Sequence, residues 1–328
     1  MGLKHVAALA VAVLAGAASV GPARPPADQD GAEAGRWVCL AVRLEPGRIW
    51  RQEVGFSTTV SGSDGKPALW TFDYRLRLQC RERLAEGWAV EARFIDWRLR
   101  LEKGGCGYSW QDGRFLYLGG GAGGDPAAGE DEGHPSCRDL LAAWSNGLRK
   151  TVLRFRLLPD GRVEDLSGLE RLHEEVADAL ASAEALPAEI RLFFGPEGLD
   201  RADHALALAL SVPRPTGRVE PGASWEHRSD LHGLLPEPLE IRRRFRLAGL
   251  DRERRFSLAL VEIDPAWDRR LPDGGWQTMP PAAEAAAEPE SIEILTDCGL
   301  VYRMEAGLAL DLPGDRHASF RLRSRLAD

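Results

Sequence analysis

Residues 70–81 read Trp-Thr-Phe-Asp-Tyr-Arg-Leu-Arg-Leu-Gln-Cys-Arg. Apolar and polar side chains alternate throughout this run, so every apolar side chain points to one face of an extended strand. After a turn at 85–87, the run 88–101 alternates in the same way and changes phase near Phe94, which predicts a β-bulge. Strands this long exceed the usual length, so we expect a long, strongly curved antiparallel hairpin.

Strand patterns recur on both sides of this hairpin. They cover residues 37–44, 48–60, 151–158, 292–296, 300–310 and 318–326. The stretch 221–225 opens a strand much as 46–50 does, and the hairpin at 245–260 mirrors the one at 70–101. These echoes predict a diverged internal duplication. The alternative is two unrelated hairpins that share common turn chemistry.

Helical spacing of apolar residues occurs between the two β-regions. It predicts helices at 137–147, 168–186 and 199–210. We therefore expect an α+β fold, in which a curved, half-barrel-like antiparallel sheet is built from two related β-halves with a helical insert between them.

The N-terminus has the pattern of a secretory signal. Lys4 precedes a short Ala/Val/Leu run, and small residues at 15–17 offer a cleavage site. We expect a signal peptide at 1–17, a disordered linker at 18–36, a first β-half at 37–158, a helical insert at 159–212 and a second β-half at 213–328. This organisation predicts an exported protein of the periplasm, the cell envelope or the extracellular space, with no transmembrane span.

The composition restricts the partners. The formal net charge of −8 argues against a nucleic-acid partner. The run Arg242-Arg243-Arg244 could form a local anion-binding face, but a solvated outer face of a sheet is the simpler interpretation.

Five cysteines in an exported chain make disulfides plausible. Cys106 and Cys137 bracket the Gly-rich segment 119–124, and a bridge between them would staple its ends. Cys39 and Cys80 occur in strand-like runs and could pair across a sheet. The odd count leaves one cysteine over, and other pairings stay open.

The motifs that carry catalysis or hold metals are incomplete in this chain. The Gly-rich run 119–124 lacks the Lys and Ser/Thr of a P-loop, and His173 lacks a second His four residues later. Glu226, His227, Asp230 and His232 crowd one strand, but the two histidines fall on opposite faces. Asp96 and Asp264 are expected to end equivalent strands as turn or cap residues. We therefore expect no enzyme, no cofactor and no metal, with an extracytoplasmic hydrolase as the competing class.

The apolar face of the hairpin is the candidate ligand site. A curved sheet with this face turned inward can hold a lipid or another hydrophobic small molecule. Its residues are Trp70, Phe72, Tyr74, Leu76 and Leu78. The alternatives are that this face is simply core, and that the protein has a structural or interaction role in the envelope.

Two short motifs carry a resemblance to a known family. They are 157–163 (LLPDGRV) running into 166–169 (LSGL), and 219–225 (VEPGASW) before the second β-region. On these motifs the chain resembles a family of uncharacterised exported bacterial proteins about 300 residues long. The resemblance implies export and β-rich structure, and it supplies no catalytic residues. At the level of the fold, the chain is also similar to the half-barrels of bacterial lipoprotein carriers and the lipid-binding β-domains of lipid-transfer proteins.

Overall fold

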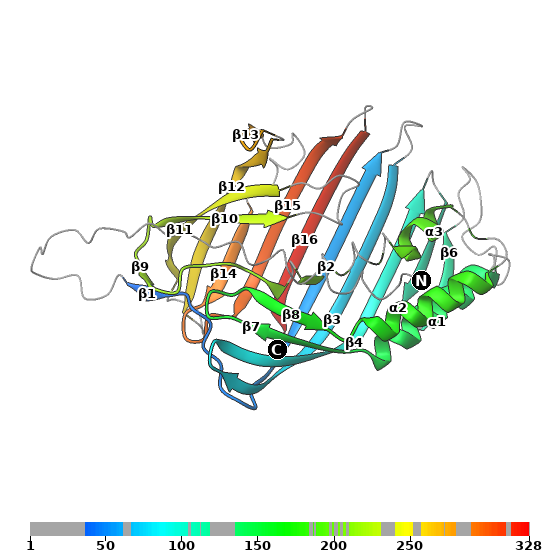
Figure 1. The fold of residues 1–328 in the computed structure, drawn as a ribbon, viewed down its shortest axis with the longest axis horizontal. Coiled ribbons are helices and arrows are strands. Elements are labelled where there is room, and N and C mark those ends of the chain that lie inside the picture. Colours follow the sequence, from blue (N-terminus) through cyan, green and yellow to red (C-terminus); the bar gives the residue numbers. More distant parts are fainter. Residues whose placement is uncertain are drawn as a thin grey trace, which may run out of the picture.

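A broad, curved antiparallel sheet forms the body of the protein in the computed structural model (Figure 1). The structure describes residues 37–327 with gaps at 62–66, 104–105, 112, 119–134, 184–185, 187, 197–198, 200–202, 204–205, 208–209, 231–239, 252–256, 272, 280–289 and 313–315. The expected signal peptide, linker and Gly-rich segment lie outside the described residues, so they stay predictions.

Fourteen strands share the large sheet, and every pairing in it is antiparallel. Its main path runs β10 (Ser224–Asp230), β11 (Glu240–Asp251), β12 (Leu258–Arg270), β14 (Ser291–Leu295), β15 (Val301–Leu312), β16 (Arg316–Ala327), β2 (Ile49–Ser61), β3 (Pro67–Leu84), β4 (Gly87–Lys103), β5 (Cys106–Gln111) and β6 (Arg114–Leu118). β13 (Trp276–Met279) pairs with β12, while β7 (Val152–Leu157) and β8 (Val163–Ser167) extend from β4. A separate two-stranded ladder joins β1 (Val38–Cys39) to β9 (Arg218–Val219).

The hairpin of β3 and β4 follows the alternation of its sequence. The two strands are 18 and 17 residues long. Their register shifts by one residue between the pairs Arg75–Asp96 and Leu76–Phe94, so Ile95 is the extra residue of a bulge. The bulge expected near Phe94 is confirmed. It explains the phase change, because an inserted residue turns the following side chains to the other face of the strand.

Three helices gather at one end of the sheet, near β4 and β6 (Figure 1). They are α1 (Pro135–Lys150), α2 (Glu170–Ser182) and α3 (Ala188–Phe194). α1 and α3 both pack on β4, and α2 packs on α1. The first two helices confirm the expected ones at 137–147 and 168–186 with shifted ends, and residues 203, 206, 207 and 210 are helical as expected. α3 was not predicted, since seven residues give too short a periodic pattern.

Two hydrophobic clusters fill the face of the sheet that the helices cover, which we call the inner face. The first core packs α1, α2 and α3 against β2, β3, β4, β5 and β7. The second core lies on β11, β12, β14 and β15, where Val38, Leu40 and Val212 from two crossing segments cover it. Both cores lie on one continuous sheet, because β16 pairs with β2 over eleven residues between Arg51 and Ser61.

The sheet is curved and does not close, so the expected α+β, half-barrel-like fold class is confirmed. β8 lies within the stretch expected to be a helical insert, and it pairs with β7. β2–β3–β4 and β10–β11–β12 are both antiparallel meanders, as the duplication hypothesis requires, but the duplication itself stays a prediction. Within the described residues, no helix combines the length and the apolar character needed to cross a membrane.

No disulfide joins the cysteines whose side chains the structure describes. Cys39, Cys80, Cys137 and Cys298 carry thiols. The predicted Cys39–Cys80 bridge is wrong because Cys39 lies in β1, beside β9, where its Sγ contacts the Thr216 carbonyl at 3.6 Å. Cys80 lies in β3, paired with Val90. The predicted Cys106–Cys137 bridge is not formed either, since Cys137 is buried as a thiol in the first core. The side chain of Cys106 lies outside the described residues.

Candidate functional site: the inner face of the sheet

A patch of half-buried apolar side chains lies on the inner face between the two cores. We call it the inner apolar patch, and it consists of Phe56, Ala306, Phe320 and Leu322. The register places Phe56 opposite Leu322, and Leu322 opposite Ala306, on three neighbouring strands. The rings of Phe56 and Phe320 lie 6.3 Å apart between centroids. Apolar side chains in direct cross-strand register form a continuous surface, because such neighbours approach closely on one face.

The position of this patch follows from strand pairing. Phe56 also lies opposite Phe72 of β3, whose ring packs on Trp144 of α1 at 5.1 Å. Leu322 packs against both the first and the second core, and Ala306 packs against the second. The patch therefore forms the boundary where the two packed regions meet.

Polar groups on the inner face are few and deeply placed. Gln52 Nε2 donates a hydrogen bond to Ser324 Oγ at 2.6 Å, and both side chains are buried. The hydroxyl of Thr58, opposite Phe320, is buried and finds no hydrogen-bond partner among the described residues. An orphaned hydroxyl in an apolar setting is costly, so Thr58 lowers the stability of the sheet at this position.

One ion pair borders the patch. Arg243 Nη2 donates to the carboxylate of Glu290 and, at 3.1 Å, to the carbonyl of Gly307 in β15. The side chains of Arg243 and Glu290 are only 14% and 12% exposed. Burial raises the pKa of Glu290, while Arg243 and the backbone N–H of Gly307 oppose that rise. The Nε of Arg243 is buried with no partner among the described residues.

Four of the five predicted ligand residues occupy a different environment from the patch. Trp70, Tyr74, Leu76 and Leu78 are buried in the first core, and Trp70 packs edge-on to Phe193 of α3 at 6.2 Å. Phe72 is half-buried beside Trp144. In this conformation these five side chains contact protein, and the half-buried apolar surface lies one to three strands away.

The sequence contains a pattern that indicates the residues of the patch, but not that they lie together. Phe320, Leu322, Ser324 and Leu326 alternate with arginines, as Phe56 alternates within its own strand. Each run predicts a strand with one apolar face. The missing information was that β16 pairs with β2, because nothing in either run identifies its neighbour.

The residues weighed as metal ligands or acid pairs are dispersed. Glu226 and His227 follow one another in β10 and so face opposite sides of the sheet. His232 lies outside the described residues, among which no group of three or more metal-ligating side chains is found. Asp96 and Asp264 lie inside β4 and β12, not at strand ends as expected, and five strands separate β4 from β12. His173, which was weighed as a zinc ligand, has its Nε2 3.1 Å from Oδ2 of Asp203.

The run of three arginines does not form a simple solvated face. Arg242 donates to Asp268 at 2.6 Å, and Arg244 lies 3.7 Å from Asp264. Arg243 is the inner-face residue described above. The expectation of a solvated outer face is wrong for Arg243, which lies on the inner face, whereas Arg242 and Arg244 lie on the opposite face and pair there with carboxylates.

Both motifs that carry the family resemblance contact the segment at 213–214. Arg214 N donates to the Asp160 carbonyl at 2.9 Å, and Trp225 Nε1 donates to the Pro213 carbonyl at 3.2 Å. His227, near Asp160 and Arg162, has its pKa lowered to about 4 by burial and by the charge of Arg162. These contacts fix the segment that crosses the second core, so the motifs have a structural explanation.

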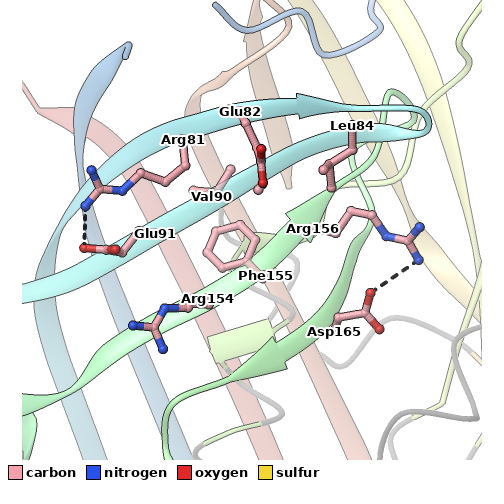
Figure 2. Close-up of a pocket in the computed structure, with 10 residues that line it drawn as sticks. Arg81, Glu82, Leu84, Val90, Glu91, Arg154, Phe155, Arg156 and Asp165 are labelled. Carbon is pink, nitrogen blue, oxygen red and sulfur yellow. Dashed lines mark ion pairs between the residues drawn. The ribbon is translucent and has the colours of Figure 1, made fainter. Parts of the chain in front are cut away.

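A pocket at the far end of the β3–β4 hairpin is the second candidate site (Figure 2). Its volume is about 460 Å³, and three arginines and three acids line it together with Leu84, Ala89, Val90 and Phe155. Arg81 pairs with Glu91 at 2.9 Å and Arg156 with Asp165 at 3.4 Å. Because these charges balance and largely pair with one another, the pocket offers no net charge to a ligand.

Comparisons with known proteins do not identify a function for this chain. No model of a known protein family and no curated protein matches the chain, so the family resemblance stays an expectation. Among solved structures, the chain is similar to lipovitellin, described for its lipid–protein interactions, with 9% identity and a TM-score of 0.33 over 87% of this chain and 26% of that one. It is also similar to an exported protein with a YmcC-like fold from Bacteroides fragilis, with 9% identity and a TM-score of 0.20 over 88% and 100%. DynF from Micromonospora chersina shares 8% identity with a TM-score of 0.19, over 92% of each chain. The chain spans about a quarter of the lipovitellin chain, and TM-scores this low carry no functional inference.

Proposed function

We propose that this is an exported, non-enzymatic protein that binds a lipid or another long apolar molecule on the inner face of its sheet. The observation that supports this most directly is the inner apolar patch. Phe56, Ala306, Phe320 and Leu322 are aligned in register across three strands and stay half-buried, although packed cores lie on either side.

The energetics favour a long chain over a small solute. Burial of each methylene contributes about 0.8 kcal/mol. Association costs roughly 4 to 15 kcal/mol before any contact is gained. A small apolar molecule therefore gains too little on this patch, whereas a fully buried hydrocarbon tail of about sixteen carbons gains about 13 kcal/mol.

The competing functions predict different surfaces. An interaction protein would need a broad apolar area exposed to solvent, whereas these side chains are half-buried on the inside of a curved sheet. A hydrolase would need a nucleophile and a base in contact. The acids considered from the sequence, Asp96 and Asp264, lie on separate parts of the sheet.

A bound-ligand measurement tests the proposal. Protein isolated from the exported fraction of its own host is examined by native mass spectrometry, and its solvent extract is analysed for lipids. We expect one apolar molecule per chain. Ligand-free protein that also fails to bind a fluorescent fatty-acyl probe would contradict the proposal.

Phe56→Glu provides the residue-level test, because it places a charge within the patch. We expect binding of the acyl probe to fall by at least about tenfold, since a carboxylate cannot be buried against a hydrocarbon chain without a partner. The matched control is Ile95→Glu. Ile95 is 46% exposed at the β4 bulge, so this variant should bind the probe as the wild type does. Equal loss in both variants would show that the effect is not specific to the patch.

A further inference from the structure

The Arg243–Glu290 ion pair places two opposite charges beside an otherwise apolar surface. Ile263 N donates to the Glu290 carbonyl, and Ser291 lies opposite Glu305 in β15, so Glu290 follows on at the level of Ala306. Its carboxylate accepts a hydrogen bond from the N–H of Gly307, directly after Ala306 in the strand. The pair therefore borders the inner apolar patch at Ala306.

Within the part of the chain that the structure describes, this pair does not use its full hydrogen-bonding capacity. Nη2 of Arg243 serves both Glu290 and the Gly307 carbonyl, while Nε is buried with no partner among the described residues. A guanidinium has five N–H donors, and a carboxylate can accept about four hydrogen bonds. Because 14% of the Arg243 side chain and 12% of the Glu290 side chain remain exposed, a ligand group at this position reaches donors and acceptors only through those exposed atoms.

The charges of the pair cancel, and this restricts the chemistry of such a group. A charged head group would add a net charge beside a pair that is already neutral and poorly solvated, and an unpaired buried charge is strongly unfavourable. A neutral hydroxyl, amide or glycerol group adds no charge and can both donate to Glu290 and accept from Arg243.

We infer that the ligand is an uncharged amphiphile, whose hydroxyl, amide or glycerol head group lies at Arg243 and Glu290 and whose hydrocarbon tail lies along the inner apolar patch. This inference rests on the proposed function and specifies its ligand class. The pair also has a structural role, since it satisfies the backbone of Gly307. The test must therefore separate head-group selection from stability.

The first experiment compares two ligands of equal chain length on the wild-type protein. Monopalmitoylglycerol and palmitate compete with a fluorescent acyl probe at pH 8, where palmitate is ionised. We expect the uncharged glycerol ester to bind at least about tenfold more tightly. Equal affinities, or a preference for palmitate, would overturn the inference and leave the proposed function standing. Failure of both ligands to bind would overturn the two together.

The second experiment changes the charge balance. Glu290→Gln leaves the cation of Arg243 without its counter-ion, so the preference should shift by about tenfold toward palmitate. The control is Glu262→Gln, which breaks the solvent-exposed Arg246–Glu262 pair, whose side chains are 57% and 52% exposed, and should leave the preference unchanged. The same shift in both variants would count against the inference.

A double variant covers the case in which Glu290→Gln does not fold. Arg243→Gln combined with Glu290→Gln keeps the site neutral, and amide side chains still donate and accept hydrogen bonds. It should retain the preference for monopalmitoylglycerol. A double variant that folds and prefers palmitate would contradict a selection based on neutral charge.

Discussion

At the scale of single residues, burial changes the pH range over which one side chain of the inner face is protonated. His227 lies on β10 near Asp160 and Arg162, and burial lowers the pKa of its imidazole to about 4. An exposed histidine has a pKa near 6.5. The folded protein therefore keeps this side chain neutral over a pH range in which the unfolded chain protonates it.

The sign of the resulting pH effect follows directly. Between about pH 6.5 and pH 4 the unfolded chain binds the proton and the folded protein does not, so stability falls as the pH is lowered through this range. We expect His227 to account for a loss of about 2 to 3 kcal/mol in the free energy of unfolding by pH 4. Urea unfolding of wild type and His227→Leu at pH 7.5 and pH 4.5 checks this.

The variant separates His227 from other groups with shifted pKa values. Glu290 has a raised pKa and so acts in the opposite direction, since the folded state then binds its proton first. His227→Leu should flatten the decline in stability and leave this opposing contribution in place. A variant with the same pH profile as the wild type would rule out the role given to His227.

At the scale of elements, the turn at 158–161 leads from β7 towards β8. It also hydrogen-bonds to the segment that crosses the second core. Gly161 has a φ of +81°, and its carbonyl accepts from Val212 N at 3.1 Å. A Cβ at this position would lie 2.3 Å from the Val212 carbonyl oxygen. This glycine is required both by its left-handed backbone and by the close approach of the neighbouring segment.

Gly161→Ala should therefore destabilise the protein far more than an ordinary left-handed glycine would predict. Gly47 is the matched control, because its φ is +87° and a Cβ added there would have no neighbouring atom within 4 Å. We expect Gly47→Ala to cost about 1 kcal/mol and Gly161→Ala to cost about 3 kcal/mol or more. Equal costs in thermal or urea unfolding would show that the crossing segment yields to the extra methyl group.

Helices and strands were predictable from the sequence where the pattern that identifies them lies within the element itself. The alternation in β3 and the phase change at Ile95 predicted the long hairpin and its bulge, because side-chain period is a property of one strand. The apolar stripe of α1 predicted that helix in the same way. What covers an apolar face is not local information, so the sequence left open whether Trp70 and Leu76 belong to the core or to a ligand site. The cysteine pairings failed for the same reason.

At the scale of the whole molecule, the two β-regions share one sheet through the β16–β2 pairing. Leu322 packs against both cores. This coupling was not predictable, since the paired residues Arg51 and Ala327 lie at opposite ends of the described chain. The sequence-based division into two β-halves describes two successive regions of the polypeptide. Whether the folded molecule also divides into these two halves stays a prediction.

We expect the protein to unfold as one cooperative unit. Hydrogen exchange at increasing urea concentrations, followed separately for amides of β4 in the first core and β12 in the second, should show both groups losing protection at the same midpoint. Leu322→Ala should lower that midpoint for both groups, because the side chain contributes to each core. Two separate midpoints in the wild type would show that the β-halves are independent folding domains.

The β16–β2 pairing also has a consequence for biosynthesis. A ribosome makes β2 before β16, so one edge of β2 lacks its neighbour until β16 has been made. Vectorial folding of the complete sheet is therefore excluded by topology. We expect the open edge of β2 to stay available for pairing until β16 emerges, and an unpaired strand edge is a template for aggregation.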